Sequence, residues 1–239
     1  MKLKQYIGRH RTNLVTYGVV ILGFVIMQML SASHMLSSSV EGFLVPICAY
    51  VVLAVSLNLV VGISGELSLG HAGFMGVGAF TGIIVAALLK TVIASKVLLL
   101  IVAIVCGGVM AGLFGVVIGL PVMRLRGDYL AIVTLAFGEI LKNLINNMYV
   151  GSDANGVHFV IGTEKPLLAE GGSMVINGPM GATGVTKLAT FPIGFALILV
   201  TLFVVLNLIN SREGRAIKAV RDNRIAAESV GINVTAFRL

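Results

Sequence analysis

The stretch from Phe43 to Leu89 restricts the fold more than any other part of the sequence. Its 47 residues contain one formal charge, Glu66. As a single helix it would extend about 70 Å, whereas the apolar core of a bilayer is about 30 Å thick. The stretch therefore predicts two membrane passes, or a broken pass with a re-entrant piece. Glycines between Gly62 and Gly73 mark the break. Because irregular backbone at membrane depth occurs only where it packs in protein or lines a cavity, the pattern favours transport machinery over a simple anchor.

The rest of the chain is equally apolar. Hydrophobic residues make up 57% of it, charged residues 11%, and the mean hydropathy is +1.02, which excludes an ordinary soluble domain. We predict an all-α polytopic membrane protein with six transmembrane segments, at residues 14–30, 43–62, 69–89, 97–123, 129–149 and 191–210. The first follows basic residues, as a signal peptide would, but lacks an Ala-x-Ala-like exit before a soluble domain, so we expect a retained helix. Cys48 and Cys106 lie in these segments, where small packing residues are favoured over a disulfide.

The distribution of positive charge predicts the orientation. The net charge is +7. With a cytoplasmic N-terminus, twelve basic residues fall inside and four outside, with Lys142 within a span, which is a clear positive-inside bias. The inside residues are Lys2, Lys4, Arg9, Arg11, Arg124, Arg126, Arg212, Arg215, Lys218, Arg221, Arg224 and Arg238, and the outside residues are Lys90, Lys96, Lys165 and Lys187. The basic excess therefore reflects topology, and we expect no nucleic-acid partner.

Segment 97–123 carries small residues at four-residue spacing: Gly107, Ala111, Gly115 and Gly119. Such a ridge lets another helix approach closely, which matters because lipid supplies no hydrophobic drive for helix association. We favour a packing seam over a substrate path at this ridge.

Segment 129–149 places polar residues on one helical face. Glu139, Lys142, Asn143 and Asn146 are spaced i, i+3, i+4 and i+7. An ionisable group near the middle of a span costs several kcal/mol unless it is paired or wet. Either Glu139 and Lys142 neutralise each other against neighbouring helices, or the face forms the polar wall of a translocation cavity. Both interpretations keep Glu139 away from lipid.

Two segments lie outside the spans. Residues 150–190 are expected to form a long external loop, which either docks an external protein or is disordered. Residues 211–231 predict two short helices. Ala216, Ile217 and Val220 lie opposite a basic face, Asp222 or Asn223 can cap the second helix, and Gly231 can end it. These helices could lie on anionic lipid or fit a groove on a cytoplasmic protein.

Three stretches together resemble the M-type permease subunit of the branched-chain amino acid ABC importers. They are residues 58–74 with Gly78-Ala-Phe80, Arg124 to Glu139, and Arg215 to Gly231, and the resemblance covers essentially the whole chain. It implies a subunit of the bacterial or archaeal cytoplasmic (inner) membrane. The implied partners are an H-type permease, two cytoplasmic ATP-binding subunits, a periplasmic or extracellular substrate-binding protein, and membrane lipid.

The resemblance also implies an ATPase-docking loop. ABC permeases share the form Glu-Ala-Ala-x-x-x-Gly, which Ala226, Ala227 and Gly231 match, while Ile225 occupies the Glu position. Asp222, Arg224 or Glu228 could supply the polar contact instead. We expect coupling through Arg224, Ala226, Ala227, Glu228 and Gly231. Family members continue with further helices, whereas this chain stops at Leu239, so we expect a truncated product or fragment.

The expected function is that of an importer subunit. The candidate translocation path comprises Asn58, Ser68, His71, Glu139 and Asn143, although His71 could simply bind a nearby carbonyl. The sequence contains no Walker loop, metal-ligand cluster or nucleophile–base pair, so we expect no enzyme activity, cofactor or metal, and ATP hydrolysis on partners. The rival is a self-contained channel or secondary transporter with a Glu139/His71 relay, and a third reading is an inert fragment. The resemblance favours Leu, Ile and Val as substrates, although relatives carry other amino acids, amides or urea.

Overall fold

The computed structural model divides the chain into two units. One comprises Met1–Leu59 with Ala189–Lys218, and the other comprises Val60–Leu188 with Ala219–Leu239. The structure describes residues 2–33, 35–90, 92–122, 125, 127–153, 156–162, 166, 172–183, 185 and 187–238. Met123, Arg124, Arg126 and Lys165, which contribute to the predicted spans and charge distribution, lie outside the described residues.

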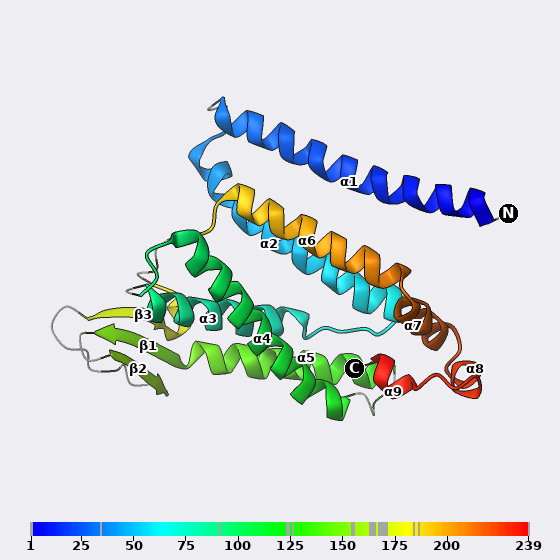
Figure 1. Ribbon diagram of the computed structural model, residues 1–239. Helices are drawn as coiled ribbons and strands as arrows, with labels where there is room; N and C mark the ends of the chain where they lie inside the picture. The colour runs from blue at the N-terminus through cyan, green and yellow to red at the C-terminus, as the bar shows by residue number, and fades with distance from the viewer. Residues whose placement is uncertain are drawn as a thin grey trace. The chain divides into compact units, whose positions relative to one another are not determined.

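The first unit is built from α1 (Lys2–Ala32), α2 (Ser38–Asn58), α6 (Phe191–Asn210) and the first part of α7 (Arg212–Asp222). Helices α2 and α6 lie side by side (Figure 1). Gly194 makes this close approach possible, because a Cβ there would lie 2.9 Å from the Cβ of Cys48. On α1, the Phe24 ring stacks on Phe195 with centroids 4.0 Å apart. Cys48 is buried in this packing as a small apolar residue, and both Cys48 and Cys106 are free thiols.

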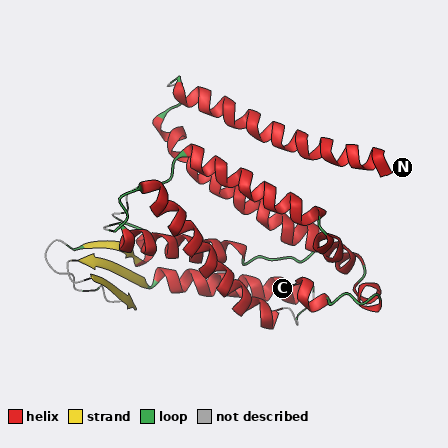
Figure 2. Ribbon diagram, in the orientation of Figure 1, coloured by secondary structure: helices red, strands yellow, loops and turns green. Residues whose placement is uncertain are grey.

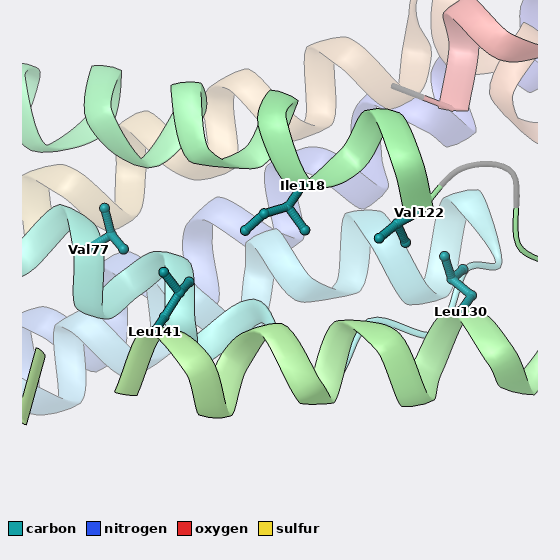
Figure 3. Close-up of a cluster of buried hydrophobic side chains, with 5 residues drawn as sticks. All are labelled: Val77, Ile118, Val122, Leu130 and Leu141. Atoms are coloured by element: carbon teal, nitrogen blue, oxygen red, sulfur yellow. The ribbon is translucent and has the colours of Figure 1, made fainter. Parts of the chain in front are cut away.

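The second unit contains three long helices and a small sheet. A π-helical turn (Leu59–Ser64) leads into α3 (His71–Leu89), followed by α4 (Lys96–Val122) and α5 (Asp128–Asn146). Side chains from these helices meet in one apolar cluster (Figure 3), formed by Val77, Ile118, Val122, Leu130 and Leu141. Two short helices, α8 (Arg224–Ser229) and α9 (Val234–Arg238), complete the unit.

The sheet follows α5 directly. Strands β1 (Met148–Asp153), β2 (Gly156–Ile161) and β3 (Ser173–Asn177) pair antiparallel in the order β2-β1-β3, and the short 3₁₀ turn η2 (Gly178–Met180) follows β3 (Figure 2). Val150 and Ile176 are its most buried side chains and pack toward α3 residues such as Phe80 and Ile83. The segment expected as a long external loop therefore contains three paired strands, and disorder is wrong for them, since β-branched and aromatic residues give them a packed face.

The predicted spans agree with the structure. Six helices in the described part of the chain are long and apolar enough to cross a membrane, and each coincides with one predicted segment. The helical part of segment 129–149 ends at Asn146, because Met148 to Val150 already belong to β1. The protein is an all-α polytopic membrane protein with a small sheet between its fifth and sixth spans.

Only some of the small residues along α4 contact α3. Gly107 packs directly on the backbone of Gly78 in α3, and a Cβ on Gly107 would collide with the Gly78 carbonyl. Ala111 lies next to the same glycine, because its Cβ would be 3.6 Å from a Cβ on Gly78. By contrast, a Cβ on Gly115 would meet no atom within 4 Å. Within this chain, the close approach is therefore made at Gly107 and not at Gly115.

We expect Gly107→Ala to destabilise the chain by about 1–3 kcal/mol, because the added methyl group forces α3 and α4 apart. Gly108→Ala is the matched control, because it makes the same change one residue away, where nothing lies within 4 Å. It should gain up to about 1 kcal/mol of helix propensity. Thermal unfolding of both variants in detergent measures the difference, and equal melting temperatures would contradict the contact at Gly78.

Candidate functional site

A cavity of about 390 Å³ lies in the second unit, against one face of α5 and the first turns of α3. It contains both charges of the polar face of α5. Its lining residues are Leu69, Ala72, Gly73, Gly76, Phe80, Leu135, Gly138, Glu139, Lys142, Ile145, Asn146, Gly178 and Gly181. Those from α5 follow i, i+3, i+4 and i+7 spacing, so a single helical face forms this wall.

Small residues bring the two helices together around the cavity. A Cβ on Gly73 would lie 3.2 Å from the Cα of Gly138 and 3.1 Å from Cδ1 of Leu141. At the other end, a Cβ on Gly178 would lie 2.9 Å from the carbonyl oxygen of Asn146, and this glycine has a positive φ of 51°. The turn after β3 therefore reaches the end of α5 only because Gly178 has no side chain.

The cavity wall carries one ion pair. Lys142 Nζ lies 3.2 Å from Glu139 Oε2 and 3.3 Å from Oε1. The two side chains are 63% and 56% exposed, and both line the cavity. Phe80, Leu135 and Ile145 supply apolar wall around them. The arrangement offers a cation and an anion side by side, within an otherwise mostly apolar space.

The connector before α3 is held by a residue that the sequence analysis does not single out, Thr134. The Leu69 N–H donates to Thr134 Oγ1 at 3.1 Å, and the hydroxyl donates to the Ala131 carbonyl at 2.9 Å. Gly70 packs so closely on the Thr134 carbonyl that a Cβ would collide with it. Thr134 thus satisfies a backbone N–H in the break and fixes Leu69 at the cavity. In the sequence, Thr134 could have been noticed only as a hydroxyl residue within the stretch from Arg124 to Glu139 that carries the family resemblance.

Replacing Thr134 by valine should destabilise the chain by about 1–3 kcal/mol, because the Leu69 N–H loses its acceptor inside the protein. Thr134→Ser keeps the hydroxyl and should lose less. Unfolding of the two variants in mixed micelles compares them. A valine variant as stable as the serine variant would show that the hydrogen bond contributes nothing.

The other expected path residues lie elsewhere. His71 begins α3, and Ser68 lies in the connector, but neither lines this cavity. Asn143 is exposed on α5 and is also absent from the lining, whereas Asn146 is present. Asn58 ends α2 in the first unit. Of the five residues expected on the path, the structure places Glu139 at this cavity.

The short helix α8 has well-defined ends. Asn223 caps it, with Oδ1 accepting from the Ala226 N–H at 3.0 Å, which confirms one of the two expected caps. Gly231, with φ 83°, ends it: the Gly231 N–H donates to the Glu228 carbonyl and the Ile232 N–H to the Ala227 carbonyl. This hydrogen-bond pair is a Schellman motif, which favours glycine at that position.

The surface of α8 differs from the expected docking face. Ala227 is 3% exposed and Val234 of the adjoining α9 equally so, because α8 packs on α9. The expectation that Ala227 offers a small surface for a partner does not fit this burial. Ile225 and Val230 are instead 80% and 75% exposed. Arg224 and Glu228 pair with each other, with Arg224 Nε 3.1 Å from Glu228 Oε1.

Helix α7 begins with a capped turn. The Gly214 N–H donates to Ser211 Oγ at 3.1 Å. A hydrogen bond from its own backbone N–H, and a further one with Ser211, hold the pKa of the Glu213 carboxyl below its ordinary value. A carboxylate in the first turn also interacts favourably with the positive end of the helix dipole. Among the described residues, no group of three or more His, Cys, Asp and Glu side chains could hold a metal ion.

Comparison with known proteins places the chain in a family. Residues 39–239 match the family model described as "Branched-chain amino acid transport system / permease component". The high-affinity branched-chain amino acid transport system permease protein LivM of Escherichia coli is 36% identical over 203 residues, which cover 80% of this chain and 45% of the relative. LivM of Salmonella typhimurium is 34% identical over the same length and coverage. The chain thus spans about half the length of these curated relatives, and no solved structure matches it. The chain belongs to the family of permease components of branched-chain amino acid transport systems.

Proposed function

We propose that this chain is the transmembrane permease subunit of an ATP-driven importer of branched-chain amino acids. It forms part of the translocation path and couples to cytoplasmic ATPases. The observation that carries the proposal is the Glu139–Lys142 pair in a mostly apolar cavity of a permease-family chain. An ionisable pair within a span is costly, and such pairs mark substrate pathways.

The cavity suits the chemistry of an apolar amino acid. Its ammonium group would bind the Glu139 carboxylate and its carboxylate the Lys142 ammonium, so the ion pair opens as the zwitterion enters. Phe80, Leu135 and Ile145 would contact the branched side chain. Binding therefore exchanges one ion pair for two, which limits the cost of desolvating the charges of the substrate.

The proposed topology places the N-terminus and residues 211–231 in the cytoplasm, and residues 150–190 on the periplasmic side. An ATPase would bind through two exposed apolar residues, Ile225 of α8 and Val230, which directly follows this helix. Position 225 is where the family docking loop carries Glu. At Gly112 and Gly115 of α4, a Cβ would meet no atom of the described residues within 4 Å. These glycines would face the H-type permease, because small residues let helices approach closely. A substrate-binding protein would deliver the amino acid from outside.

The rival function, a secondary transporter with a Glu139/His71 relay, has less support. Glu139 is bonded to Lys142, and His71 does not line the cavity. Residues 224–231, folded as a capped helix with an exposed apolar face, suit a docking element, which a self-contained transporter does not need.

Co-expression with the two ATPases, the H-type permease and the binding protein tests the proposal. We expect the tagged chain to retain both ATPases through purification, and leucine-loaded binding protein to stimulate ATP hydrolysis in liposomes. Leucine uptake by the chain alone, driven by an ion gradient without ATP, would support the secondary transporter instead. If the chain retains no ATPase and supports no uptake, the result favours the third hypothesis, an inert fragment.

A further inference from the structure

Basic side chains on one face of α7 donate hydrogen bonds to backbone carbonyls. Arg215 Nη1 donates to the Asn210 carbonyl at 3.3 Å, and Lys218 Nζ to the Ile209 carbonyl at 3.5 Å. Both acceptors lie at the C-terminal end of α6, where basic side chains commonly satisfy the last carbonyls of a helix. These two contacts fix the corner between α6 and α7 and are local in sequence.

Arg221 makes a contact of a different kind. Its Nη1 donates at 3.0 Å to the carbonyl of Gly62, 159 positions away in the sequence. Gly62 belongs to the π-helical turn that precedes the glycine-rich connector. A broken helix leaves carbonyl groups that need partners, and a guanidinium is a strong donor to them. Arg221 therefore joins the end of α7 to the break before α3.

Gly65 and Asp222 fix the position of the Arg221 side chain. A Cβ on Gly65 would lie 2.6 Å from Cγ and 3.0 Å from Cδ of Arg221, so the aliphatic stem occupies the space that a side chain at 65 would fill. Gly65 also has a φ of 75°, which favours glycine. Asp222 Oδ1 accepts from Arg221 Nη2 at 2.9 Å and from Nε at 3.0 Å, which orients the guanidinium.

The far end of the same connector reaches the cavity. Leu69 lines the cavity, and its N–H is held by Thr134 of α5. The segment from Gly62 to Leu69 is thus held by Arg221 at one end and by Thr134 at the other. On the cytoplasmic side, Arg221 lies three residues before the start of α8. The segment therefore connects the region next to α8 with the cavity.

We propose that Arg221 is the positioning residue that transmits movement of the docking helix α8 to the broken helix and so to the mouth of the cavity. This inference rests on the proposed importer function, which supplies the ATPase that moves α8. Arg221 binds no substrate and no nucleotide. Its action is mechanical: while it holds the Gly62 carbonyl, the connector follows α8, and without it the connector and α8 move independently.

The test uses the complete transporter with a fluorophore on Leu67→Cys, in a background without native cysteines. Leu67 lies in the connector and is 48% exposed. In the otherwise unmodified transporter we expect the fluorescence to shift on ATP addition. In Arg221→Gln we expect ATPases still bound and ATP still hydrolysed, but no shift and about a tenfold fall in amino acid imported per ATP.

Two further variants make the result specific. Arg215→Gln removes the same charge and one carbonyl contact from the same helix, and should keep the shift and the import ratio. Gly65→Ala displaces the stem of Arg221 and should reproduce Arg221→Gln, and the double variant should be no worse than either single one. A shift that persists in Arg221→Gln would overturn this inference alone. Failure of the unmodified chain to retain ATPases would overturn the proposed function, and this inference with it.

Discussion

Glu139→Lys is expected to reduce amino acid uptake by the assembled transporter at least tenfold and to lower the yield of inserted protein. The variant places two cations one helical turn apart in a mostly apolar cavity, where Lys142 loses its partner. An uncompensated charge within a span costs about 2.5–3.5 kcal/mol on insertion scales, and each 1.4 kcal/mol corresponds to tenfold in an equilibrium. Uptake of radiolabelled leucine and the amount of folded complex are measured together.

The double variant Glu139→Lys/Lys142→Glu separates two roles of the pair. It restores opposite charges at the same spacing, so the yield should return. Uptake should stay low if the pair binds a zwitterion, because the substrate would meet each charge at the wrong end of the cavity. If uptake returns together with the yield, the pair only neutralises itself, and the path through this cavity is wrong.

Sequence patterns predict the spans well because membrane insertion depends on local composition. The single charge between Phe43 and Leu89 and the glycine break are properties of short windows, and the π-helical turn and connector fall at that break. Asn223 and Gly231 are equally predictable, since caps act within one turn of the helix.

Features that depend on contacts between residues far apart in the sequence could not be predicted from local sequence patterns. The sheet forms because Val150 and Ile176, 26 positions apart, pack against α3. Thr134 gains its role only when Leu69 is brought beside it, and nothing in the local sequence of α5 indicates that partner. The same holds for Gly107, which contacts Gly78, whereas a Cβ on Gly115 in the same repeat would meet no atom of the described residues within 4 Å.

The burial of Ala227 also depends on a tertiary contact, the packing of α9 on α8. A substitution at this position therefore affects the fold of the segment before it affects a partner. Because α9 folds back onto α8, Ala227→Arg would put a large charged side chain into an intramolecular contact. Loss of ATPase binding in that variant would accompany unfolding of α8 and α9, visible as protease sensitivity after residue 223. It therefore tests the fold of this segment and not a groove on a partner.

The exposed face of α8 provides the sharper test of coupling, and Ile225→Arg is expected to weaken ATPase retention at least tenfold. Ile225 is 80% exposed, so a substitution there leaves the packing on α9 unchanged, and protease resistance should match the parent chain. The variant removes the apolar contact and introduces a cation in its place. Loss of a hot-spot residue at the centre of an interface costs about 2 kcal/mol or more, which exceeds tenfold in the dissociation constant. Thr235→Arg is the matched control, because it adds the same charge at an exposed position of α9. Equal ATPase retention in the two variants, measured by co-purification at several salt concentrations, would place the docking contact outside α8.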